Sequence, residues 1–125
     1  MRVAVMIVVA IGLSGCGKTE PTLAGGKPVS FWVQALHDPD AKLRKKAAFK
    51  LGNVGPTDPT ALPALIEALH DADAGVRAEA ILALVKFGPA ATAAVPTLAE
   101  VQRQDQDAKV REYAGKALAK LQPSP

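Results

Sequence analysis

The first stretch that could carry chemistry is GLSGCGKT, residues 12–19. It fits the pattern G-x-x-x-x-G-K-[ST], in which backbone amides and a lysine hold the phosphates of a nucleotide. Such a site also needs a helix directly after the loop, because the N-terminal amides of that helix complete it. Residues 20–28 contain two prolines and two glycines, which do not carry a helix, and no run beyond residue 28 would build a parallel sheet. We therefore predict that the chain binds no nucleotide despite the match.

Other reactive side chains are few. His37 and His70 lie 33 residues apart, and paired histidines could bind a metal or relay protons. No cysteine, glutamate or third histidine joins them at the spacing of metal ligands, so we interpret both as residues suited to a helix C-terminus and a turn. Neighbouring acids such as Asp71 and Asp73 are interpreted as turn caps. We predict no catalytic residue, no metal and no cofactor.

The lone cysteine has a different explanation. Arg2 precedes a mostly apolar run, residues 3–13, that has the length of the hydrophobic region of a signal peptide and is too short to span a membrane. Ser14 and Gly15 are small, and Cys16 follows them directly. LSGC resembles the lipobox of bacterial lipoproteins, Leu-(Ala/Ser)-(Gly/Ala)-Cys. The resemblance implies cleavage before Cys16, a thioether-linked diacylglycerol on its sulfur and acylation of its new amino group. An uncleaved apolar N-terminus is the alternative, and it leaves Cys16 unexplained.

These features predict how the chain is divided. We expect a signal peptide over residues 1–15, the lipidated Cys16 with a flexible linker over residues 16–27, a folded body over residues 28–121 and a short tail, 122–125. The lipobox implies an exported protein anchored on the periplasmic face of a membrane. Position 17 is glycine rather than aspartate, which in a cell with two membranes resembles sorting to the outer membrane.

Composition limits the class of the body. The chain has 125 residues, enough for one domain, and 49% of them are hydrophobic but only 4% aromatic. The apolar content is therefore mostly alanine, leucine and valine, which favours closely packed helices over strands. A net charge of +3 is too small to indicate nucleic-acid binding, and a single cysteine forms no intrachain disulfide.

The body repeats itself. Residues 35–44, ALHDPDAKLR, return as residues 68–77, ALHDADAGVR, and a weaker copy, DQDAKVR, occupies residues 105–111. A period in the thirties indicates stacked supersecondary units. Apolar residues at helical spacing predict two helices in each unit. We expect three repeats, at about 28–55, 60–88 and 93–121.

The turns between the two helices of each unit are marked by acids. Asp40, Asp73 and Asp107 are placed to cap the second helices. Gly55 and Gly88 are placed to end the first two of those helices. The local sequence therefore fixes where the second helices begin and where two of them stop.

The pattern D-x-D-x-x-[VL]-R occurs at residues 38–44, 71–77 and 105–111. With the A-x-x-A-L that follows it, this pattern resembles HEAT repeats, specifically the short type found in phycobilin-lyase-related proteins. The resemblance implies an all-α fold, a right-handed solenoid of antiparallel helix pairs with the second helices lining its concave side. It also implies a structural ladder between repeats, which maps onto Asp40, Arg44, Asp73, Arg77, Asp107 and Arg111.

Two features of the first unit break the repeat. Phe31 replaces smaller residues of the other units and is predicted to be an exposed contact or an N-terminal cap, whereas Trp32 is predicted to lie in the core. Four lysines fall on one stripe of the second helix: Lys42, Lys45, Lys46 and Lys50. This lysine stripe is either a solvated helix face or a surface that meets an anionic membrane or an acidic partner.

Together these features predict a membrane-anchored exported lipoprotein whose repeats form a non-catalytic protein-interaction scaffold. The expected partners are an unidentified protein and the membrane, with no nucleic acid. The alternative is an enzyme or enzyme subunit related to phycobilin lyases, acting on a bound chromophore or small ligand. That alternative follows from the family resemblance alone.

Overall fold

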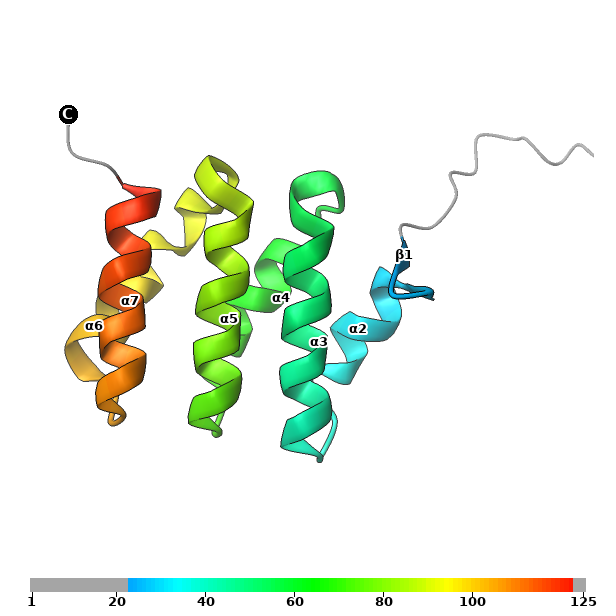
Figure 1. Ribbon diagram of the computed structural model, residues 1–125, viewed down its shortest axis with the longest axis horizontal. Coiled ribbons are helices and arrows are strands. Elements are labelled where there is room, and N and C mark those ends of the chain that lie inside the picture. Colours follow the sequence, from blue (N-terminus) through cyan, green and yellow to red (C-terminus); the bar gives the residue numbers. More distant parts are fainter. Residues whose placement is uncertain (1–22, 123–125) are drawn as a thin grey trace, which may run out of the picture.

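The computed structural model describes residues 23–122, so the predicted signal peptide, Cys16 and residues 123–125 lie outside the described part of the chain. A short antiparallel hairpin opens the fold and three pairs of helices follow it (Figure 1). The elements are β1 (Leu23–Ala24), β2 (Lys27–Pro28), α2 (Val29–Ala35), α3 (Ala41–Val54), η2 (Gly55–Thr57), α4 (Ala61–Ala68), α5 (Ala74–Phe87), η3 (Gly88–Ala94), α6 (Val95–Gln104) and α7 (Ala108–Leu121).

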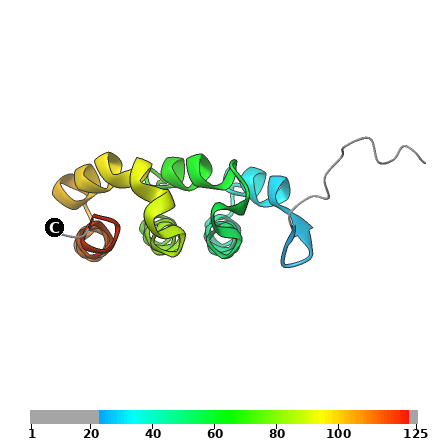
Figure 2. The same cartoon turned by 90° about the horizontal axis from the view of Figure 1, so that it is seen from above.

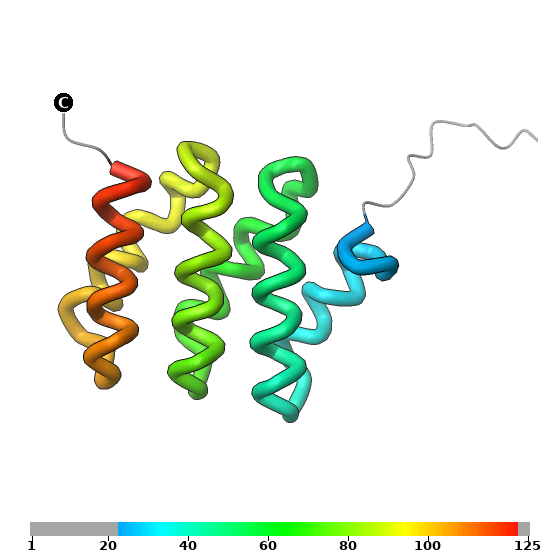
Figure 3. Tube along the Cα trace, in the orientation of Figure 1, coloured from blue at the N-terminus to red at the C-terminus, as the bar shows by residue number. Residues whose placement is uncertain are grey.

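The helix pairs stack side by side in two layers. Figure 2 shows the second helices, α3, α5 and α7, end-on in one row, with the first helices, α2, α4 and α6, in a shallow arc over them. The chain passes from each pair to the next in sequence order, as the trace in Figure 3 shows. The predicted all-α solenoid is confirmed, and the pairs at 29–54, 61–87 and 95–121 lie within the ranges expected for the repeats.

Local signals determine the ends of the second helices. Asp40 accepts a hydrogen bond from the amide of Lys42, and Asp73 and Asp107 each accept two from the first turns of α5 and α7. These bonds satisfy amides that have no partner within a helix. Gly55 and Gly88 follow α3 and α5 with φ of 67° and 61°, a conformation that favours glycine. The predicted caps and stops are therefore confirmed.

The core combines leucine and alanine. Leu51, Leu65, Leu69, Ile81, Leu84 and Leu98 are among its fully buried side chains. Small residues bring α3 and α5 close together, since a Cβ added to Gly52 would lie only 2.7 Å from the Cβ of Ala83. Trp32 is buried in this core, as predicted.

The predicted flexible linker, residues 16–27, is wrong in its C-terminal part. Residues 23–28 form the β1–β2 hairpin, and Gly25 and Gly26 have φ of 61° and 81°. Two successive glycines supply the two positive φ angles that a two-residue hairpin turn requires. The buried indole of Trp32 donates from Nε1 to the carbonyl of Ala24 at 2.7 Å, so the hairpin is tied to α2 and covers the N-terminal end of the stack.

The stretch Ala74–Gln104 is long and apolar enough to cross a membrane by length and composition. In the structure it is α5 and α6, which belong to neighbouring units and are joined by η3. Its apolar residues, such as Ile81, Leu84 and Leu98, are fully buried within the stack. Packing between repeats therefore explains this hydropathy signal.

Candidate functional site

One edge of the stack holds the turns between the two helices of each unit and the arginines beside them. Arg44 lies in the first turn of α3. Its Nε and Nη2 donate to the two carboxylate oxygens of Asp71, in the next turn, at 2.9 and 3.1 Å. Its Nη1 donates to the carbonyls of Asp38 and Pro39 at 2.8 and 3.1 Å. One guanidinium thus joins the turn of its own unit to the turn of the next.

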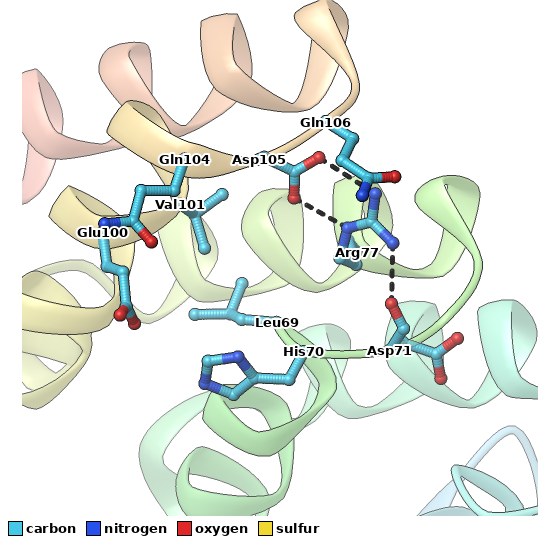
Figure 4. Close-up of a pocket in the computed structure, with 9 residues that line it drawn as sticks. All are labelled: Leu69, His70, Asp71, Arg77, Glu100, Val101, Gln104, Asp105 and Gln106. Carbon is cyan, nitrogen blue, oxygen red and sulfur yellow. Dashed lines mark hydrogen bonds and ion pairs between the residues drawn. The ribbon is translucent and has the colours of Figure 1, made fainter.

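Arg77 repeats this arrangement one unit later (Figure 4). Its Nε and Nη2 donate to Asp105 at 2.8 and 2.9 Å, and its Nη1 donates to the carbonyls of Asp71 and Ala72 at 2.7 and 3.2 Å. The side chains of Arg77 and Asp105 are only 14% and 7% exposed. A bidentate, charge-assisted pair of this kind is stronger than a neutral hydrogen bond, and its geometry fixes how two units are aligned.

The predicted ladder is wrong about its acids. Asp40, Asp73 and Asp107 cap helices and form no ion pair with an arginine in the described part of the chain. The acids that bind arginine are Asp71 and Asp105, the first aspartates of their D-x-D motifs. The second aspartate of each motif is occupied by the amides of the helix that follows.

The ladder consists of two ion pairs between units, Arg44–Asp71 and Arg77–Asp105, each of which we call a rung. Asp38 and Arg111, at its two ends, form no such pair among residues 23–122. Arg111 donates to the carbonyl of Asp105, as its counterparts do within their own turns, but no ion pair joins it to a carboxylate among residues 23–122. At the other end, Asp38 accepts from the amide of Asp40 at 2.9 Å. The arginines predicted for the ladder therefore differ in role, because Arg44 and Arg77 join units and Arg111 braces only its own turn.

The hydrogen bonds of the two rungs shift the pKa values of Arg44, Arg77 and Asp105. Burial acts to raise the pKa of Asp105, but hydrogen bonds from Arg77 and from the amide of Asp107, with the charges of Arg77 and Arg111, outweigh it and lower that pKa. Hydrogen bonding to Asp105 and Asp71 raises the pKa of Arg77 and of Arg44, against the opposing effect of burial. The Arg77–Asp105 pair therefore stays ionised near neutral pH, as expected for a structural contact.

A cavity of about 410 Å³ lies beside the Arg77 rung and is drawn in Figure 4. The donors of Arg77 point at Asp105 and at backbone carbonyls, while Glu100 and Gln104 lie on the far side of the cavity. The charged groups on the Arg77 side of the cavity are Arg77 and the carboxylates of Asp71 and Asp105. They are therefore already paired in the two rungs.

The histidines lie near this edge, and one has a neighbour that the sequence did not indicate. His37 Nε2 is 3.6 Å from Glu67 Oε1, and both side chains are largely exposed. His70 lines the cavity beside Arg77. Within residues 23–122, no group of three or more His, Cys, Asp or Glu side chains is placed to hold a metal ion.

The second helices carry a different set of charges. By the second-helix face we mean the exposed side chains of α3, α5 and α7. Apart from the three turn arginines, these helices carry eight lysines and only two acids, Glu79 and Glu112. Glu112 is 3.6 Å from Lys116, in a pair that is exposed on both sides. The basic lysines are Lys42, Lys45, Lys46, Lys50, Lys86, Lys109, Lys116 and Lys120.

The predicted lysine stripe is divided by the structure. Lys42 and Lys45 are exposed on the second-helix face. Lys46 lies 5.9 Å from the ring centroid of Trp32, and a Cβ on Gly25 would lie 2.7 Å from Nζ of Lys50. Lys46 therefore lies toward α2 and Lys50 toward the hairpin, both at the N-terminal end of the stack.

Phe31 lies at the same N-terminal end. Phe31 is 39% exposed, and its ring packs edge-on against the ring of Trp32, with 4.9 Å between the two centroids. Lys27 lies over the ring, 4.9 Å from its centroid. The exposed position predicted for Phe31 is confirmed, and its neighbours are the hairpin and α2.

Sequence reasoning missed two exposed apolar residues on the second-helix face, Phe49 and Leu82. They occupy equivalent positions of the first two units and are 43% and 44% exposed. Lys86 lies 4.6 Å from the ring centroid of Phe49 and donates to Asn53 at 2.9 Å. Phe49 falls between Lys45, Lys46 and Lys50 in sequence, so a helical projection that included apolar residues would have shown it.

A groove of about 230 Å³ opens on this face between α5 and α7. Leu82, Val85, Tyr113 and Ala117 line it, with Lys116 and Lys120 beside them. Val85 occupies the position that Gly52 has in α3, counted by the 33-residue repeat. Glycine lets α3 and α5 touch, whereas α5 carries the larger valine at the equivalent position, and Val85 is one of the residues that line the groove.

The comparisons with known proteins agree with this architecture. A family model of HEAT repeats matches residues 29–121, from the first residue of α2 to the last residue of α7. The match therefore includes all three helix pairs. A comparison with curated proteins finds no match.

Proposed function

The chain belongs to the HEAT-repeat family, and from this membership together with the LSGC motif at residues 13–16 we propose that it is an exported, lipid-anchored scaffold that binds a protein partner on its second-helix face. HEAT repeats generally mediate protein–protein interaction, and stacked repeats present extended surfaces for it. The observation that carries the proposal is the exposure of Phe49 and Leu82 among lysines on that face. Aromatic and aliphatic side chains within a polar surround are typical of binding surfaces.

A non-catalytic scaffold without cofactor is favoured over an enzyme related to phycobilin lyases by where the polar groups lie. An enzyme needs reactive side chains that converge on a substrate. Here Arg77, Asp105 and Asp71 beside the 410 Å³ cavity are engaged in the two rungs, and the groove between α5 and α7 is lined mainly by apolar residues.

The anchor would hold the N-terminal end of the stack near the membrane. Six residues, 17–22, separate Cys16 from the first residue of β1. An extended residue spans at most about 3.6 Å, so Leu23 would lie within roughly 25 Å of the lipidated Cys16. That end carries the exposed Leu23 and Phe31 together with Lys27, which suits a position beside a bilayer.

The anchor is tested by Cys16→Ser. We expect the variant to accumulate as an uncleaved precursor, while the wild type loses residues 1–15, gains lipid mass and partitions into detergent. Two acyl chains or more give stable attachment where one does not. A wild type that carries no lipid, or that binds ATP tightly through Lys18, would contradict the lipoprotein assignment.

The binding face is tested by photo-crosslinking in intact membranes. A photoreactive residue is placed at Leu82, on the second-helix face, and in a second protein at the exposed Gln34 of α2. We expect a discrete adduct, identified by mass spectrometry, from position 82 and none from position 34. Equal adducts from both positions, or an adduct from position 34 alone, would refute the second-helix face as the binding surface.

A further inference from the structure

We propose that the groove between α5 and α7 binds an acidic segment of the partner protein, with a large apolar side chain on Leu82, Val85 and Ala117 and carboxylates against Lys116 and Lys120. This inference rests on the proposed function, because it names the chemistry of the partner that the second-helix face receives. It uses only side chains within residues 23–122.

The size of the groove indicates what kind of group it holds. Its volume is about 230 Å³, below the range of about 300–1,000 Å³ that is usual for sites of whole small molecules. One or two side chains of a polypeptide fit a space of this size. Leu82 and Val85 form one wall on α5, and Tyr113 and Ala117 form the other on α7, so an inserted side chain would meet apolar atoms from both helices.

The charge around the groove indicates what flanks that side chain. Lys116 and Lys120 lie one helical turn apart on α7, and both line the groove. On all three second helices, only Glu79 and Glu112 oppose the eight lysines. Because complementary charge governs association rate and partner choice, this surface selects acidic segments and repels basic ones.

A protein segment suits the groove better than a membrane does. A bilayer presents a broad surface that meets protruding side chains, whereas this apolar site is recessed between two helices. Leu23 and Phe31 also expose apolar surface, but they lie at the hairpin end of the stack, away from the groove. The two ends of the stack therefore suit different ligands, lipid near the hairpin and an acidic segment near α7.

The test uses the full chain, purified in nanodiscs of phosphatidylcholine, which carries no net charge. The probe is a fluorescent 14-residue peptide with leucines at positions i, i+3, i+4 and i+7 and glutamates between them. Two matched peptides replace glutamate by glutamine or leucine by alanine. We expect the acidic leucine peptide to bind, and each matched peptide to bind about tenfold more weakly or worse, since both charge and an apolar anchor are needed.

Variants of the protein locate the site. Leu82→Ala, and separately the double change Lys116→Gln with Lys120→Gln, should each weaken binding by about three- to tenfold, and the lysine variant should also lower its salt dependence. All three side chains are exposed, so these variants should fold normally. The matched control, Lys27→Gln with Arg103→Gln, removes the same charge away from the groove and should leave binding unchanged.

An equal loss of peptide binding in the control and in the lysine variant would overturn the proposal. It would show that the acidic peptide is attracted to the basic protein as a whole and not to the groove. Binding that is indifferent to Leu82→Ala would also overturn the proposal. No peptide binding, together with a Lys116- and Lys120-dependent binding to phosphatidylglycerol vesicles, would assign the groove to lipid instead. A crosslink from position 82 to a native partner without peptide binding would refute this inference and leave the scaffold function standing.

Discussion

The turn edge, where the turns between the two helices of each unit lie, and the second-helix face both carry cations, and they use different residues for them. At the turn edge, the guanidinium forks of Arg44 and Arg77 meet carboxylates bidentately and also hold backbone carbonyls. On the second-helix face the cations are lysines, which are exposed and flexible. The comparison teaches that the arginines of the two rungs are held inside the fold, while most lysine charge lies on the exposed surface, with Lys86 bonded to Asn53 and Lys116 near Glu112.

The largest expected effect comes from breaking the central rung. Arg77→Ala removes four hydrogen bonds and leaves the carboxylate of Asp105 without its main partner. We expect a loss of about 1–3 kcal/mol in the free energy of unfolding, measured by urea denaturation. Arg111→Ala, which removes a bond within one turn only, should cost less. An Arg77→Ala variant with the same free energy of unfolding as the wild type would show that the rung is only a surface contact.

Acid should weaken the same rung, with a definite sign. The folded pKa of Asp105 is lowered from the ordinary value of 3.8, so its carboxylate stabilises the fold above about pH 4, and that contribution is lost as the pH falls through the lowered folded pKa. Asp105→Asn should therefore be less stable than the wild type at pH 7, and the difference should shrink on acidification. A difference that is constant from pH 7 to pH 2 would show that the ionised pair does not stabilise the fold.

The smallest effect on stability is expected from the lysine stripe, where we predict a change in binding instead. In a soluble form starting at Gly17, Lys46→Gln with Lys50→Gln should weaken binding to anionic vesicles at low salt more than Lys42→Gln with Lys45→Gln does, because Lys46 and Lys50 lie toward the N-terminal end of the stack. The free energy of unfolding of both variants should lie within about 0.5 kcal/mol of the parent value. Equal binding of parent and variants to anionic and neutral vesicles would rule out the membrane role and leave an acidic partner or a solvated face.

These tests separate charge that aligns repeats from charge that meets a ligand. They also bear on the proposed groove, because Lys116 and Lys120 lie on the second-helix face but far along the chain from the lysine stripe. A membrane effect confined to Lys46 and Lys50, with a peptide effect confined to Lys116 and Lys120, would show that one basic face serves two ligands.

The sequence by itself determined the repeats, the class of fold and the ends of the second helices. Those features depend on contacts between near neighbours, such as Asp73 with the amides two and three residues later, and on glycines whose φ is positive. A pattern read along the chain contains such information directly.

Only the tertiary structure decided which acids pair with the arginines, that residues 23–28 form a hairpin, and where the second-helix face is recessed. Arg44 meets Asp71 and Arg77 meets Asp105 across 27 and 28 residues of sequence, and two acids in each motif were equally available until stacking placed one beside the arginine. The groove is lined by residues of both α5 and α7, so no single helix specifies it. Local bonding fixes each helix, but the spacing between helices is set by side chains that come together only after the units pack.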